Sequence, residues 1–290
     1  MKFLITISLF TISFLFAEKI LVLNSNNNIE KYSSVEKSFK EDFIGDIKSL
    51  NISEMTNKQI KEYLYDEYPD IVYAIGTKAY KYADMYIPEK TLFFSSIVNY
   101  KRLNLTKNRL GVSNELHSGM NLTIIKSLFP NTQKLTIVYS SYTKELFENF
   151  KQNGLEIGIE IIGEEIGAHK NIDIEKIQHS DGLILIADPL LLKDEKKVLS
   201  LFEQVKKLQK PIFAYHELFI KFDATLVISA DNPTIGRQIA SMISQYVQKK
   251  EFTPIQMPMG TNVIFNKKIA DNLNLKYNKN GLSLVNKVLD

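Results

Sequence analysis

The chain of 290 residues contains no cysteine and no tryptophan. Without cysteine it has no disulfide, thiolate metal ligand, iron–sulfur cluster or cysteine nucleophile. Three catalytic signatures are also missing: G-x-G-x-x-G for dinucleotides, G-x-x-x-x-G-K-[ST] for phosphates and the nucleophile elbow G-x-S-x-G. The four histidines lie far apart and never form the zinc pattern HExxH. We therefore expect no catalytic residue, no metal and no cofactor.

The chain has no large excess of positive or negative charge. The 36 Lys and Arg residues nearly balance the 33 Asp and Glu residues, and the basic residues are scattered along the chain. A nucleic-acid-binding protein usually shows a basic patch, so we expect no nucleic-acid partner. Hydrophobic residues make up 44% and charged residues 24%, which excludes a disordered, collagen-like or coiled-coil chain. The length is that of about two globular domains.

An apolar run without any charge lies at the N-terminus. Lys2 precedes it, residues 3–16 are interrupted only by Thr and Ser, and Ala17 follows. The run is shorter than the ~20 residues that span a bilayer. The pattern predicts a secretory signal peptide over residues 1–17, cleaved after Ala17, and a periplasmic protein. A buried first strand or an uncleaved anchor is the alternative; a lipid-anchored form is excluded because no cysteine follows the run.

Short apolar runs alternate with helical patterns along the rest of the chain. The predicted strands are Lys19–Asn24, Ile71–Ile75, Thr91–Ile97, Leu135–Ser140, Ile157–Ile162, Gly182–Ala187, Pro211–Ala214 and Thr225–Ser229. Consecutive apolar residues are typical of strands buried on both faces, as in parallel sheets. Three apolar stripes at helical spacing lie between or after them: Leu122, Ile125, Leu128 and Phe129; Val198, Leu201, Phe202, Val205 and Leu208; Ile235, Ile239, Met242, Ile243 and Tyr246. The alternation predicts an α/β fold with parallel sheets.

Hydrogen-bonding side chains lie at or just beyond the carboxyl ends of six of these strands. They are Thr77, Ser96 with Asn99, Ser140 with Ser141 and Tyr142, Asp188, Tyr215 with His216, and Asp231. Ligands of open α/β sheets bind beyond the carboxyl ends of the strands. We expect Thr77 and Ser141 to cap helices whose positive N-terminal ends favour a ligand carboxylate. The alternative is that these residues are only helix caps and turns.

The order of several segments resembles a known family. The segments are PDIVYAIGTKA at 69–79, TLFFSSIVNY at 91–100, LGVS at 110–113, LFPNTQKLTIVYS at 128–140, DGLILIADP at 181–189, PIFA at 211–214, SADNPTIGRQIA at 229–240 and IFN at 264–266. Over nearly the whole mature chain the sequence resembles the type I periplasmic substrate-binding proteins of ABC transporters. The similarity is greatest to the branch that includes tryptophan/tyrosine-type importers.

The resemblance implies two lobes, each a parallel sheet flanked by helices, joined by three hinge crossings. We place the crossings near residues 113–114, 230–231 and 258–260. The N-terminal lobe is then 18–113 with 231–258, and the C-terminal lobe is 114–230 with 259–290.

The resemblance also implies ligand positions at Thr77, in the loop 97–100, in the turn 140–143, and at Asp188 and Asp231. Where the family often has V-T-D-P, this chain has Ile97-Val98-Asn99-Tyr100, so the acid and the proline are both replaced.

The function that we expect is capture of a small molecule in the cleft between the lobes for an ABC importer. The ligand would be an amino acid or another small carboxylate or aromatic compound, held by Tyr100, Tyr142 or Tyr215 and by hydrogen bonds at Thr77, Ser96 and Asp188. We expect a monomer whose partner is an ABC permease. A periplasmic sensing module for a membrane receptor or sensor kinase is the first alternative, and an α/β enzyme is the second.

Overall fold

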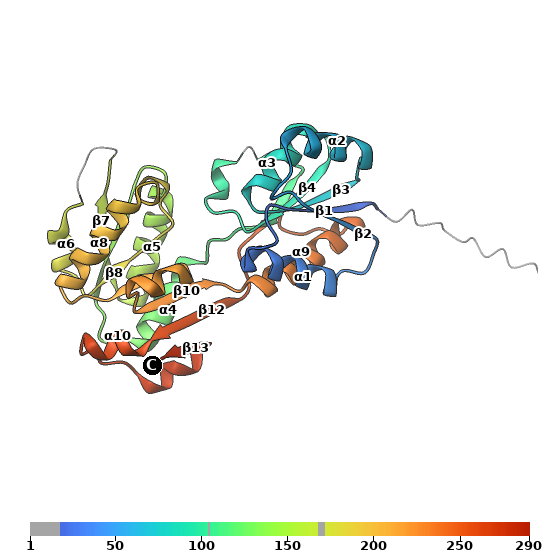
Figure 1. The fold of residues 1–290 in the computed structure, drawn as a ribbon. Coiled ribbons are helices and arrows are strands. Elements are labelled where there is room, and N and C mark those ends of the chain that lie inside the picture. The colour runs from blue at the N-terminus through green and yellow to red at the C-terminus, as the bar shows by residue number, and fades with distance from the viewer. Residues whose placement is uncertain (1–17, 104, 168–171) are drawn as a thin grey trace, which may run out of the picture.

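The computed structural model describes residues 18–103, 105–167 and 172–290. The predicted signal peptide therefore lies outside the described residues. The chain forms two β-sheets, each with helices on both faces, and the two lobes lie side by side in Figure 1. Within the described ranges, no helix is both long and apolar enough to cross a membrane.

The first lobe is built on a six-stranded parallel sheet of order β11-β5-β4-β3-β1-β2. Its strands are β1 (Ile20–Asn24), β2 (Ile47–Asn51), β3 (Ile71–Ile75), β4 (Thr91–Ser95), β5 (Arg109–Val112) and β11 (Ile255–Gln256). Helices α1 (Glu30–Asp42) and α9 (Asn232–Val247) pack on one face, and α2 (Asn57–Glu67) and α3 (Thr77–Tyr86) on the other. All five residues of both β1 and β3 are buried, as expected for strands covered on two faces.

The second lobe is built on a seven-stranded sheet of order β13-β12-β10-β9-β8-β6-β7, which is parallel except between β10 and β12. Its strands are β6 (Lys134–Tyr139), β7 (Glu160–Glu165), β8 (Leu183–Ile184), β9 (Ile212–Ala214), β10 (Leu226–Ala230), β12 (Thr261–Asn266) and β13 (Lys287–Leu289). The helices are α4 (Ser118–Leu128), α5 (Lys144–Ile157), α6 (Ile174–Gln178), α7 (Pro189–Leu192), α8 (Glu195–Lys207) and α10 (Lys267–Asn272). Helices α4 and α5 pack on one face of the sheet, and α6, α7 and α8 on the other.

The chain passes between the two sheets three times. It leaves the first sheet after β5 and enters α4, returns from β10 into α9, and leaves again from β11 into β12. Helix α9 lies so close to α1 that a Cβ on Gly236 would be 2.3 Å from the Val35 carbonyl oxygen. The first lobe is thus completed by a segment from the C-terminal part of the sequence (Figure 1).

Most strand and helix predictions are confirmed, including Ile71–Ile75 and the three apolar stripes, which lie on α4, α8 and α9. The strand predicted at Ile157–Ile162 is wrong at its start. Ile157 ends α5, Gly158 turns the chain with φ 73°, and β7 begins at Glu160. Strand β2 was not predicted because its sequence IKSLN is half polar and only partly buried.

Candidate functional site

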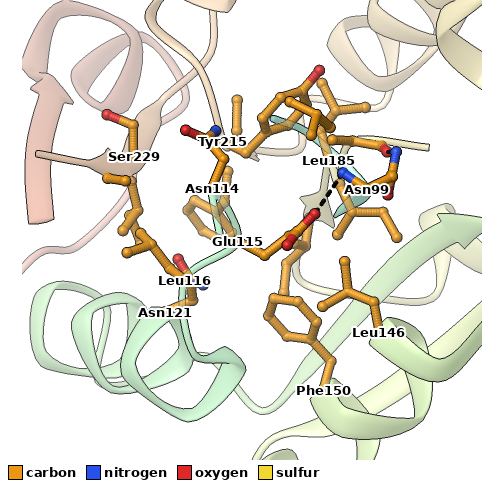
Figure 2. Close-up of a pocket in the computed structure, with 18 of the residues that line it drawn as sticks. Asn99, Asn114, Glu115, Leu116, Asn121, Leu146, Phe150, Leu185, Tyr215 and Ser229 are labelled. Atoms are coloured by element: carbon orange, nitrogen blue, oxygen red, sulfur yellow. Dashed lines mark hydrogen bonds between the residues drawn. The ribbon is translucent and has the colours of Figure 1, made fainter. Parts of the chain in front are cut away.

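A cavity lies where the first crossing meets the carboxyl ends of β8, β9 and β10 (Figure 2). We call it the junction cavity. In this conformation its volume is about 70 Å³, less than the ~300–1,000 Å³ of typical ligand pockets. Its walls are mainly apolar and include Leu116, Ile125, Leu146, Phe150, Ile186 and Phe213. Because strands, helices and a crossing contribute to the walls, movement of the lobes would change the shape of the cavity.

The polar groups of the junction cavity are few. They are Asn99, Asn114, Glu115, Asn121, Tyr215 and Ser229. The Glu115 carboxylate accepts a hydrogen bond of 2.6 Å from the backbone N–H of Asn99, drawn as a dashed line in Figure 2. Burial raises the pKa of Glu115, and hydrogen bonds from backbone N–H groups, that of Asn99 foremost, oppose the rise. Glu115 is thus a partly desolvated carboxyl held in place by the first lobe.

Asn99 connects the lobes across this cavity. It adopts a left-handed backbone conformation with φ 55°, which brings the loop after β4 back toward the second lobe. Its side-chain Nδ2 donates a hydrogen bond of 2.9 Å to the Ala187 carbonyl, beyond β8. Asn99 therefore contacts Glu115, in the first crossing, through its backbone N–H, and Ala187, beyond β8, through its side chain.

A second hollow, the outer cavity, shares Asn99 and Glu115 with the junction cavity. Its volume is about 360 Å³, larger than that of the junction cavity, and it is also lined by Tyr100 and Tyr142. Two contacts join the lobes here: Lys101 forms an ion pair with Glu145, and the Arg102 guanidinium lies 4.9 Å from the centre of the Tyr142 ring. Such exposed contacts are individually weak, so they allow the lobes to part.

Tyr215 lines the junction cavity from the end of β9. Its ring packs against Phe219 with the two ring centres 5.4 Å apart. Burial raises the pKa of Tyr215 to about 12, so the phenol stays neutral and can donate or accept a hydrogen bond at physiological pH. Of the predicted aromatic side chains, Tyr215 lies in the junction cavity, whereas Tyr100 and Tyr142 lie in the outer one.

The Asp188 carboxylate is fully occupied by the protein. One oxygen accepts hydrogen bonds from the backbone N–H groups of Leu190 and Leu191, capping α7. The other accepts from the backbone and the hydroxyl of Ser140 and from the Thr143 hydroxyl. Asp188 has 0% exposed surface and does not line either cavity. Its contacts hold the turn after β6 against α7.

The two predicted helix caps at Thr77 and Ser141 are wrong. Helix α3 begins at Thr77 itself, and its cap position is Gly76, whose φ of 85° suits a residue without a side chain. Helix α5 begins at Lys144, after Thr143, while Ser141 is exposed in the preceding turn. The turn extends further than expected because Asp188 binds both Ser140 and Thr143. Neither Thr77 nor Ser141 lines the two cavities.

Two further predicted residues, Asp231 and Ser96, lie outside the junction and outer cavities. Asp231 caps α9 by accepting from the Thr234 backbone N–H at 2.9 Å. It lines a third hollow beside Tyr215 and His216, on another side of the lobe junction. Ser96 is buried in a left-handed conformation with φ 59°. Its hydroxyl has no hydrogen-bond partner within the described ranges, and it lines neither the junction nor the outer cavity.

Several lining residues were not predicted from the sequence, namely Asn114, Glu115, Leu116, Asn121, Leu146 and Phe150. The first three follow β5 in the first crossing, and the others lie on α4 and α5. A usable signal was the crossing itself, because a segment that joins two lobes borders the space between them.

The comparison with protein families decides the assignment. The sequence model described as "ABC transporter substrate binding protein" matches residues 18–289. The chain belongs to this family. For the ABC transporter substrate-binding family, the two-lobed α/β fold is the expected one, and membership implies a small-molecule ligand and an ABC permease partner. No curated protein sequence matches the chain.

Solved structures of low sequence identity share the fold of this substrate-binding protein. An ABC domain in complex with L-Trp from Streptococcus pneumonia is 19% identical, with a TM-score of 0.60 over 93% of this chain and 100% of that one. The ligand-free, open structure of a substrate binding protein with adhesive properties from Clostridium difficile is 14% identical, with a TM-score of 0.69 over 94% and 99%. These likenesses confirm the type I periplasmic-binding-protein architecture predicted from the sequence.

Proposed function

We propose that this protein binds one small solute in the junction cavity and delivers it to an ABC permease without covalent chemistry. The observation that carries the proposal is the cavity itself, which combines apolar walls with a few convergent polar groups at the carboxyl ends of β8, β9 and β10. Phe150 and Leu146 would contact the body of the solute, and Glu115 and Asn114 its polar groups.

We further propose that the lobes 18–113 with 231–258 and 114–230 with 259–290 close on the solute by a hinge at the three crossings. The contacts of Asn99 with Ala187 and of Lys101 with Glu145 would form on closure and break on release. A solute held by both lobes would stabilise the closed form because it adds contacts that the open form lacks.

Export through the predicted signal peptide is part of this proposal, because a solute-binding protein must meet its solute outside the cytoplasm. N-terminal sequencing of the protein from the cell envelope tests it. We expect a start near Glu18, and intact Met1 on cytoplasmic protein would contradict it.

A thermal-shift screen tests the binding function. The purified protein is melted with amino acids, amines, small acids, purines and sugars. A solute at a hundredfold excess over its Kd adds ~2.7 kcal/mol to the free energy of unfolding, which corresponds to a Tm increase of roughly 5–10 °C for a protein of this size class. A screen in which no small solute raises Tm would contradict the proposal.

A further inference from the structure

The junction cavity has an unbalanced charge. Glu115 is the one acidic side chain among its lining residues, all of which are described, and no Lys, Arg or His side chain lines it. The basic side chains of the neighbouring outer cavity have partners of their own. Lys101 pairs with Glu145, Arg102 lies on the Tyr142 ring, and His117 accepts a hydrogen bond from the Gly119 backbone N–H through Nδ1. The lining that a ligand contacts in this cavity therefore carries a negative side chain and no positive one.

The carboxylate of Glu115 is fixed but not neutralised. The Asn99 backbone N–H holds it at 2.6 Å, while apolar side chains such as Leu116 and Phe150 line the space around it. Burial raises the pKa of Glu115 and the Lys101 charge opposes the rise, but Lys101 is ion-paired with Glu145. A partly desolvated carboxylate without an ion pair of its own is unfavourable, and a cation brought in by the ligand would reduce that cost. A ligand carboxylate in the same space would meet repulsion instead.

Two of the three amides of the cavity already donate to the protein. The Asn99 amide N–H is bound to the Ala187 carbonyl, and the Asn121 amide N–H to the His117 carbonyl. Their carbonyl oxygens, like the hydroxyl of Tyr215, can accept from an ammonium group. The Asn114 amide, which has no hydrogen-bond partner among the described residues, can donate or accept. The charge of Glu115, and not a shortage of neutral donors, therefore carries the preference for a cation.

We propose, resting on the function proposed above, that the solute is a small apolar primary amine whose ammonium group pairs with Glu115. Its apolar body lies against Leu116, Leu146 and Phe150, and it carries no carboxylate. The cavity thereby distinguishes an amine from the amino acid that carries the same apolar group. The amino acid would place its carboxylate where no cationic side chain lines the wall.

Three compounds that share an indole ring test the charge selectivity: tryptamine, tryptophan and indole-3-propionate. The chain contains no tryptophan, so excitation beyond the absorption of tyrosine reports the indole of the ligand alone. We expect tryptamine to bind at least tenfold more tightly than tryptophan, and indole-3-propionate to bind most weakly.

Two variants identify the group responsible. Glu115→Gln keeps the size and an acceptor for the Asn99 N–H but removes the charge; we expect it to weaken tryptamine binding roughly ten- to a hundredfold. Because burial raises the pKa of Glu115, its ionised form costs stability at neutral pH, so the ligand-free Glu115→Gln protein should melt no lower than wild type. Glu148→Gln, an exposed position on α5 outside the lining, is the matched control and should bind like wild type.

The outcomes separate this inference from the function on which it rests. If tryptophan or indole-3-propionate binds more tightly than tryptamine, or if Glu115→Gln binds tryptamine as wild type does, the amine proposal is overturned and solute binding stands. If none of the three binds while another, non-cationic solute of the thermal-shift screen does, the result is the same. If no solute binds at all, both proposals fall.

Discussion

Asp188→Asn is the substitution that best separates a structural role from a ligand role. The Asp188 side chain is fully buried and accepts hydrogen bonds at both oxygens, from Leu190 and Leu191 on one side and from Ser140 and Thr143 on the other. Asparagine supplies only one oxygen. If that oxygen keeps the cap on α7, the new NH₂ group faces the Ser140 backbone N–H, which cannot accept a hydrogen bond.

The cost follows from this mismatch. Leaving one buried donor unsatisfied costs ~1–3 kcal/mol, and hydrogen bonds to a neutral acceptor are weaker than those to a charged one by about 1 kcal/mol each. We expect Asp188→Asn to lower the free energy of unfolding by about 3–5 kcal/mol. A loss of this size is a large share of the ~5–15 kcal/mol that stabilises a typical domain.

Urea unfolding followed by far-UV circular dichroism measures the loss. Asp194→Asn is the control, because Asp194 is exposed and caps α8 through one hydrogen bond of 3.2 Å to the Lys197 backbone N–H. Asparagine caps nearly as well as aspartate, so this variant should lose less than about 0.5 kcal/mol. The reasoning is refuted if Asp188→Asn is as stable as wild type but loses affinity for its solute, since Asp188 would then be a ligand residue.

Three further predictions concern the rest of the molecule. Asp231→Asn keeps the cap of α9 and should change neither stability by more than about 0.5 kcal/mol nor affinity in calorimetry; a tenfold loss of affinity would place Asp231 in the site. Gly236→Ala puts a Cβ 2.3 Å from the Val35 carbonyl oxygen, so urea unfolding should show a loss of about 1–3 kcal/mol, and wild-type stability would contradict the close packing of α9 on α1. Burial, and then the nearby Lys31 charge, lower the pKa of His216, with Glu217 opposing. The unfolded chain therefore takes up a proton there before the folded protein does, and the free energy of unfolding should fall as pH decreases from about 7 to 5. His216→Asn should flatten that fall, and an unchanged pH profile would show that His216 is not its source.

The strands that are buried on both faces could be predicted from the sequence alone. Ile71–Ile75 is buried on both faces, so its apolar residues run without a break and its strand is predicted to the residue. Strand β2 lies at the edge of the sheet, where IKSLN needs no continuous apolar pattern, and it was missed. The pattern of apolar residues reflects which side chains are buried. It therefore gives a weak prediction for a strand that is only partly buried, such as β2.

The candidate site was harder to predict because a polar residue at a strand end can either line a ligand cavity or hold the protein's own turns and helix ends. Tyr215 and Asn99 were expected in the cleft and line the junction cavity. Asp188 follows its strand in the same way, yet its carboxylate is occupied by Ser140, Thr143 and the start of α7. Only the three-dimensional hydrogen bonding distinguishes the two cases. Glu115 could be found only through its place in the first crossing, because the rest of its surroundings come from segments distant in the sequence.

The central claim is that a solute occupies the junction cavity, and a single inserted tryptophan tests it most directly. Leu146 lines the cavity from α5, while Leu155 on the same helix is 69% exposed and outside the lining. In a chain without tryptophan, Leu146→Trp and Leu155→Trp each carry one fluorescent reporter.

The measurement is tryptophan emission during titration with a non-indole solute that raises Tm in the screen, such as 2-phenylethylamine. The account predicts that Trp emission of Leu146→Trp changes and saturates at one solute per protein, or that this variant no longer binds in calorimetry, while Leu155→Trp binds normally with unchanged emission. Full binding by Leu146→Trp with no change in its emission would contradict the claim, because the solute would then lie elsewhere.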